Sequence, residues 1–61
     1  MQTQTNPTAE SNRRIREAER QVRRATHDGA KYATAFDVWV GVFGLDRNEA
    51  IQLSQLLEDV A

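Results

Sequence analysis

The scarcity of cross-linking residues limits how this chain can fold. It has 61 residues, no cysteine and one histidine, so it can form neither a disulfide nor a zinc site built from thiolates. A domain of this size buries little apolar surface and lies near the lower limit for folding on a hydrophobic core alone. We therefore expect one small domain that gains stability by self-association.

The first long segment has the period of an α-helix. Asn6 and Pro7 are a favourable start, because Asn is a good N-cap and Pro fits the first helical position, and Gly29 favours a stop. We predict a helix over residues 7–26, preceded by a flexible polar tail of residues 1–6. Apolar residues recur in it at intervals of three and four and form one narrow stripe: Ile15, Ala18, Val22 and Ala25.

Opposite charges along the same segment support the helix locally. Each such pair contributes a few tenths of a kcal/mol at spacings of three or four residues. The pairs expected here are Glu10–Arg14, Glu17–Arg20 and Glu19–Arg23.

Five arginines gather on another side of this predicted helix. With His27 beside them, they fall within an arc of roughly 100° when each residue turns the helix by about 100°. Guanidinium groups stay charged and donate hydrogen bonds in a planar fork, which suits phosphates and carboxylates. We call this set the arginine face: Arg13, Arg16, Arg20, Arg23 and Arg24.

Residues 30–43 fit two kinds of structure. Their alternating β-branched and aromatic residues suit a strand, but a lone strand has no partner elsewhere in the sequence. A helix groups the large apolar residues better, so we predict a helix over residues 30–43. Its broad apolar face would be formed by Tyr32, Ala33, Phe36, Trp39, Val40 and Phe43.

A third helix is predicted over residues 46–60. Gly44 ends the preceding helix, and the run from Asp46 to Glu49 resembles a capping box. One face of this helix is apolar: Ala50, Leu53, Leu56, Leu57 and Val60. The predicted fold class is therefore all-α, a small three-helix domain spanning residues 7–61 that self-associates.

The second predicted helix has more apolar surface than its neighbours can cover. Three further apolar residues point away from its broad face and would remain exposed to solvent in a monomer: Ala35, Val38 and Val42. Gly41 costs about 1 kcal/mol relative to alanine in mid-helix, which suits a site where another backbone approaches closely. We expect an oligomer or partner interface here, with Val38, Trp39 and Val42 as contacts. Alternatively, the first helix folds over these valines.

Charge is divided unevenly along the chain although the net charge is only −1. Residues 12–31 hold seven Lys and Arg against three Asp and Glu, and residues 32–61 hold one against five. Such segregation can orient a partner or pair two copies. It can equally reflect a basic helix lying against an acidic one within the domain.

The arginine face has three interpretations. It could follow the phosphates of a nucleic acid, dock on carboxylates of a protein target or second copy, or carry only solvated charge. Segment 36–55 also resembles a helix-turn-helix unit, in which the second helix reads bases. The side chains that would contact nucleic acid there are Arg47, Asn48, Gln52 and Gln55.

Other classes of function have little support in the sequence. His27 at a helix end is better explained by the helix dipole than by catalysis, and the three glycines form no phosphate-binding loop. No apolar run reaches the roughly 18 residues that span a bilayer, and residues 1–7 do not form a signal peptide. We expect no catalytic residues, no metal, no cofactor, no membrane partner and a cytoplasmic location.

These observations predict a non-enzymatic protein–protein interaction module that acts as a regulator, inhibitor or adaptor. It would act through the arginine face and the apolar second helix, on a protein with an acidic surface, on a second copy of itself, or on both. The alternative is a DNA- or RNA-binding regulator that uses the arginine face on phosphates and the third helix near bases.

Overall fold

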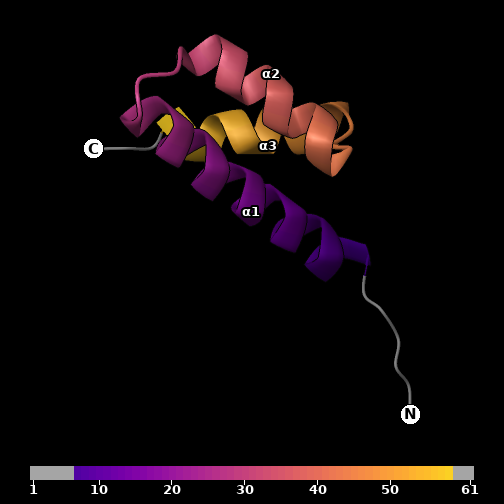
Figure 1. Ribbon diagram of the computed structural model, residues 1–61. Coiled ribbons are helices and arrows are strands. Elements are labelled where there is room, and N and C mark those ends of the chain that lie inside the picture. The colour runs from indigo at the N-terminus through magenta and orange to yellow at the C-terminus, as the bar shows by residue number, and fades with distance from the viewer. Residues whose placement is uncertain (1–6, 59–61) are drawn as a thin grey trace.

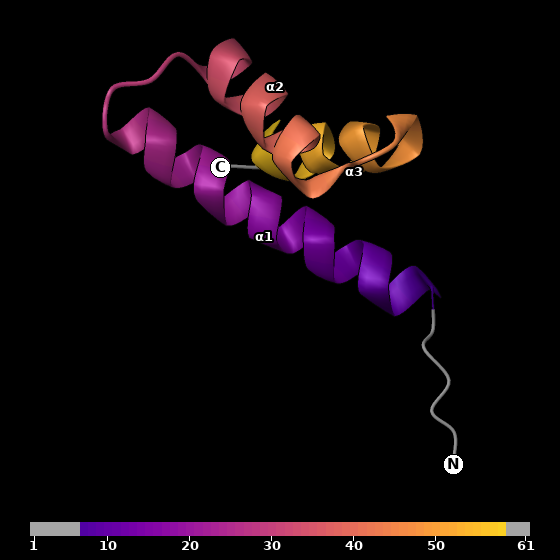
Figure 2. The ribbon, with the colours of Figure 1, turned by 45° about the vertical axis from the view of Figure 1, so that its right-hand side comes forward.

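The computed structural model describes residues 7–58 and contains the three expected helices. Helix α1 spans Pro7–His27, α2 spans Tyr32–Phe43 and α3 spans Arg47–Glu58. Helices α1 and α3 run in the same general direction, and α2 runs in the opposite one (Figure 1, Figure 2). The predicted all-α class is confirmed. The predicted tail at residues 1–6, the cap at Asn6 and the end of the third helix at residues 59–60 lie outside the described residues.

Glycines end the first two helices in the left-handed region of backbone space. The φ angle is 105° at Gly29 and 63° at Gly44, values that side chains disfavour. After Gly44, the Leu45 N–H donates to the Val40 carbonyl oxygen at 3.0 Å. This bond is typical of a Schellman motif, which turns the chain sharply out of a helix.

Helix α2 begins two residues later than the sequence predicts. The Ala30 N–H donates to the Ala25 carbonyl oxygen at 2.9 Å, so Ala30 belongs to the cap that closes α1. Lys31 is extended, with φ −73° and ψ 139°, and serves as the N-cap of α2. The predicted start at residue 30 was wrong because α1 uses these residues for its own termination.

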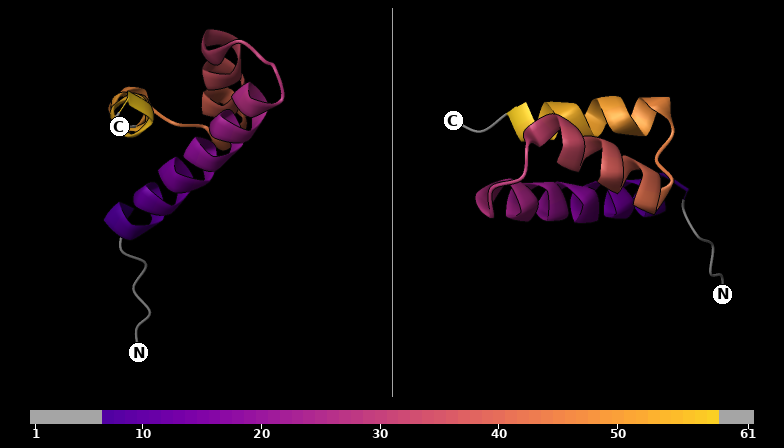
Figure 3. Two further views of the ribbon diagram at one scale, coloured as in Figure 1. Left: turned by 90° about the vertical axis from the view of Figure 1, so that its left-hand side faces the viewer. Right: turned by 45° about the horizontal axis from the view of Figure 1, so that its top comes forward.

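Helix α1 is the element on which the other two pack. Figure 3 shows α2 and α3 on the same side of α1 and splayed apart from each other, and direct contacts between α2 and α3 are few. The buried apolar residues come from all three helices and from the turn before α3: Ile15, Ala18, Val22, Ala35, Leu45, Leu53 and Leu57. Half-buried residues pack around them: Ala25, Phe36, Trp39, Val40, Phe43 and Leu56.

Helix α2 packs on the core with most of its predicted apolar face, namely Phe36, Trp39, Val40 and Phe43, but three residues differ from the prediction. Ala35, which we expected to be exposed to solvent, is only 4% exposed and belongs to the core. Tyr32 and Ala33, expected to face inward, are exposed. The small side chain of Ala35 is thus part of the contact between α2 and the core, while the first turn of α2 lies at the surface.

Leu53 provides a test of this core. Its side chain is fully buried, so we expect Leu53→Ala to cost about 2–5 kcal/mol of unfolding free energy. A domain of this size rarely has more than about 3–5 kcal/mol, so the variant should be largely unfolded at 25 °C by circular dichroism. Ile51→Ala, at a half-exposed position of the same helix, should cost about 1 kcal/mol or less. Equal losses for both variants would contradict the described core.

Candidate binding surfaces

The start of α3 is fixed by a reciprocal capping box. The Glu49 backbone N–H donates to Asp46 Oδ1 at 2.8 Å, and the Asp46 N–H donates to Glu49 Oε1 at 3.0 Å. This confirms the capping box that the sequence predicts at these two residues. Both side chains therefore hold the turn between α2 and α3 in one conformation.

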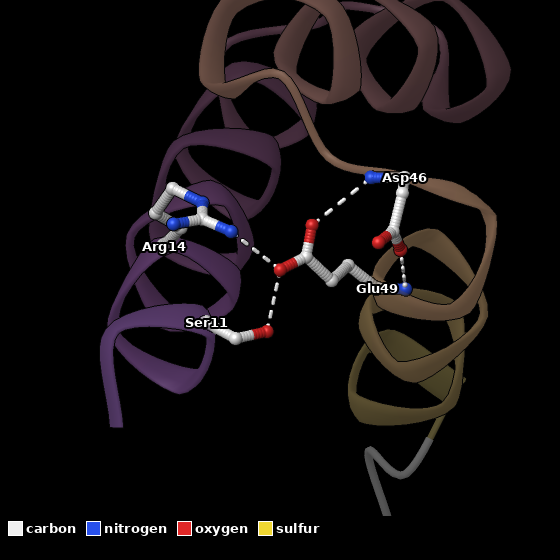
Figure 4. Close-up of polar contacts among 4 residues, drawn as sticks. All are labelled: Ser11, Arg14, Asp46 and Glu49. Atoms are coloured by element: carbon white, nitrogen blue, oxygen red, sulfur yellow. Dashed lines mark hydrogen bonds and ion pairs between the residues drawn. The ribbon is translucent and has the colours of Figure 1, made fainter. Parts of the chain in front are cut away.

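Glu49 also joins α3 to α1 (Figure 4). Its Oε2 atom accepts hydrogen bonds from the Ser11 hydroxyl and from the Arg14 guanidinium, which lie three residues apart on α1. The residue is only 6% exposed although it is charged. A buried carboxylate needs such partners, because an unpaired one would pay the full cost of losing water.

The environment of Glu49 favours its ionised form. The hydrogen bond from Ser11 makes the largest contribution to lowering the pKa of this carboxyl, followed by that from the Asp46 N–H. Burial acts in the opposite direction, and the Arg14 charge adds to the lowering. The net effect keeps the pKa of Glu49 below its ordinary value.

Arg14 has a different partner from the one that the sequence indicates. The spacing predicts a local pair with Glu10, but the guanidinium contacts Glu49 from α3 instead. The other two expected pairs are present, with Arg23–Glu19 at 2.9 Å and Arg20–Glu17 at 3.9 Å. The only sequence signal for the interhelical pair was that Ser11 and Arg14 share one side of α1.

The arginine face lies on one uninterrupted helix, as the sequence predicts. Its five arginines and His27 are all exposed, whereas the stripe at Ile15, Ala18 and Val22 is buried. The arginine face therefore lies mainly on the side of α1 opposite the core, and Arg16 and Arg23 are the members of this face that reach α3. Within residues 7–58, Arg13, Arg16 and Arg24 have no ion-pair partner.

One arginine of the arginine face also forms a hydrogen bond that links α1 to α3. The Arg23 Nη2 atom donates to the Leu56 carbonyl oxygen at 3.1 Å, near the carboxyl end of α3, where a positive charge is favourable. One ion pair between helices in the described residues, Arg14–Glu49, joins the basic segment 12–31 to the acidic segment 32–61, as a basic helix lying against an acidic one would. Arg14 is not part of the arginine face, so this pair does not neutralise that face.

A groove of about 580 Å³ lies along the boundary between α1 and α3. It brings Arg16 together with Gln52 and Gln55, three residues that the sequence assigned to two separate sites. Arg47 and Asn48 are exposed on α3 but do not line this groove. The remaining lining residues are Asn12, Ile15, Leu56 and Glu58.

A second depression of about 640 Å³ lies between the start of α2 and the end of α3. We call it the α2/α3 cleft. It exists because α2 and α3 diverge from their common turn and both rest on α1 (Figure 3). The residues that line it are Tyr32, Ala33, Thr34, Phe36, Asp37, Val38, Ser54 and Glu58.

The three apolar side chains expected to contact a partner on α2 differ in their exposure to solvent. Val38 is 50% exposed and Val42 is 61% exposed, as predicted. Trp39 is half-buried against the core, with its ring centroid 5.8 Å from that of Phe43. Of the three predicted apolar contacts, the two valines are therefore available on the surface and Trp39 mainly stabilises the fold.

Comparisons with protein-family models, with curated proteins and with solved structures found no match to this chain. Within residues 7–58, no group of His, Asp and Glu side chains is arranged to hold a metal ion. None of the three described helices combines the length and hydrophobicity needed to cross a bilayer.

The Glu49 contacts predict a pH-dependent stability. Because folding lowers the pKa of Glu49, its contribution is present above the unfolded pKa of roughly 4.3 and is lost as pH falls through the folded value. Glu49→Gln should lower the thermal midpoint at pH 7, and the difference from the unmodified protein should shrink as the pH falls below the unfolded pKa and through the lowered pKa of folded Glu49. Thermal unfolding followed by circular dichroism measures both. Glu17→Gln, at a more exposed carboxylate, serves as the control and should change the midpoint little.

Proposed function

We propose that this protein is a non-enzymatic interaction module that docks on another protein through the apolar surface of α2, as a regulator, inhibitor or adaptor. The observation that carries the proposal is the exposure of Val38 and Val42, which are four residues apart on one face of a helix. Tyr32 on the same helix is also exposed by 46%. Clustered exposed apolar side chains of this kind mark interaction sites more often than isolated ones do.

Gly41 gives independent support to a contact on α2. A Cβ atom built at this residue would meet no atom within 4 Å, so nothing in the described chain requires a glycine there. Glycine in mid-helix nevertheless costs about 1 kcal/mol relative to alanine. A partner whose backbone approaches α2 beside the two valines would give this residue a function.

The arginine face would supply charged contacts on the other side of α1. Arg13, Arg16 and Arg24 are exposed, and within residues 7–58 none of them is neutralised by a carboxylate. Guanidinium groups pair well with carboxylates on a partner, and such pairs speed association more than they raise affinity. The proposed partner therefore carries an acidic region for this face.

The proposal is tested by comparing how much partner protein is captured by the unmodified protein and by its single-residue variants. Tagged protein incubated with nuclease-treated native lysate should retain one protein in stoichiometric amount. Val38→Glu and Val42→Glu should each reduce that amount at least tenfold, because a charge would have to be buried at the contact. Gln55→Glu adds the same charge on the exposed side of α3 and should leave capture unchanged.

The proposal falls if the two valine variants, shown to be helical by circular dichroism, retain the partner as well as the unmodified protein. Sedimentation of the purified protein at high micromolar concentration identifies the case in which the partner is a second copy. In that case, association should depend on protein concentration and should be abolished by Val42→Glu.

A second candidate function is binding of DNA or RNA by a regulator. The observation that favours it is the groove between α1 and α3, where Arg16 lies beside the amides of Gln52 and Gln55. Arginine suits phosphates, and amide side chains can hydrogen-bond base edges. Glu58 in the same groove opposes it, since its charge repels phosphate.

Fluorescence anisotropy with a mixed-sequence oligonucleotide tests this candidate. Binding should fall steeply between about 50 and 200 mM salt, because several phosphate contacts release counterions. Arg16→Gln should weaken it roughly tenfold, the effect of losing a charged hydrogen bond. Lys31→Gln removes the same charge outside the groove and should have a smaller effect. Absence of binding by the folded protein at low salt eliminates the candidate.

A further inference from the structure

We propose that the α2/α3 cleft binds a basic amphipathic helix of the partner protein. This inference rests on the proposed function, since it names the chemistry of the segment that docks beside α2. It depends on the shape, the apolar lining and the charge of the cleft.

The cleft has an apolar side formed by α2. The rings of Tyr32 and Phe36 lie with their centroids 5.9 Å apart and their planes tilted by 43°, and Val38 also lines the cleft. Both Tyr32 and Val38 are about half exposed, so they can still lose water on contact with a partner. A cleft of about 640 Å³ is large enough for a few apolar side chains of a docked helix.

The charged residues of the cleft have one sign. Asp37 lies on α2 and Glu58 on α3, and none of the described residues that line the cleft is basic. Within residues 7–58, neither carboxylate pairs with a Lys or Arg side chain. A segment with apolar residues on one face and Lys or Arg at its edges would match both the apolar side and the two carboxylates.

A second copy of this chain fits the cleft less well. The exposed basic residues of the described chain are concentrated on the arginine face of α1, and the apolar stripe of the same helix is buried in the core. On α3, the exposed residues Arg47 and Ile51 lie one helical turn apart, but that surface has one basic and one large apolar residue. No described helix therefore combines several basic residues with several exposed large apolar residues on one surface. The required combination must come from a different protein.

Fluorescence anisotropy with designed peptides tests the inference on the full-length protein. The probe is a labelled amphipathic helical peptide of about 18 residues made of leucine and lysine, long enough to form a helix when bound. A peptide with glutamate in place of lysine and a scrambled leucine–lysine peptide serve as controls. We expect the basic amphipathic peptide to bind at least tenfold more tightly than either control.

Two matched pairs of variants locate the bound peptide. Val38→Asn should weaken binding at least tenfold, whereas Ile51→Asn, which also replaces a half-exposed β-branched residue but lies outside the cleft, should alter it less than threefold. The double variant Asp37→Lys with Glu58→Lys should also weaken binding at least tenfold. Its control, Glu10→Lys with Asp28→Lys, makes the same change in net charge at exposed residues away from the cleft.

The outcomes separate this inference from the proposed function. No binding of the basic peptide, equal binding of the glutamate peptide, or equal effects within a matched pair overturns the cleft inference alone. Capture of a native partner that survives both Val38→Glu and Val42→Glu overturns the proposed function as well. Capture that is lost in those variants but unaffected by Asp37→Lys with Glu58→Lys keeps the docking surface and rejects a basic partner.

Discussion

The whole fold depends on the burial of one narrow stripe on α1. Ile15, Ala18 and Val22 belong to one core cluster with residues of both other helices, and α1 contacts α2 and α3 while α2 and α3 contact each other little. The small side chain of Ala18 allows close approach of the packed helices, and Ala35 does the same from α2. Because this stripe is continuous, the opposite side of α1 is free to carry charge, which explains why the arginine face and the core coexist on one helix.

The number and type of the helices could be predicted because several local signals agreed. Apolar spacing, the glycines at residues 29 and 44, and the capping box at Asp46 all indicated the same boundaries to within two residues in the described range. These are properties of neighbouring residues, so a single sequence contains them. The exposure of Val38 and Val42 followed from the same helical spacing.

The orientation of α2 could be predicted only in part. Phe36, Trp39 and Phe43 pack against the core as expected. The apolar residues of α2 cover most of its circumference, so the spacing alone does not reveal that Ala35 is buried and Tyr32 exposed. The pairing of Glu49 with Arg14 could not be predicted either, because it joins residues 35 positions apart and Glu10 is a plausible local partner for Arg14. The groove that unites Arg16 with Gln52 and Gln55 depends on the same packing of α3 on α1.

The two shorter helices are attached to α1 in unequal ways. Helix α3 is tied near its start by Glu49 and near its end by the contact between Arg23 and the Leu56 carbonyl oxygen. In the described residues, α2 has no comparable polar tie to α1 and is held by apolar packing alone. The position of α3 relative to α1 is therefore restrained by directional polar contacts at two places, whereas the position of α2 depends on the fit of apolar side chains alone. A change of shape in the core should consequently displace α2 more readily than α3.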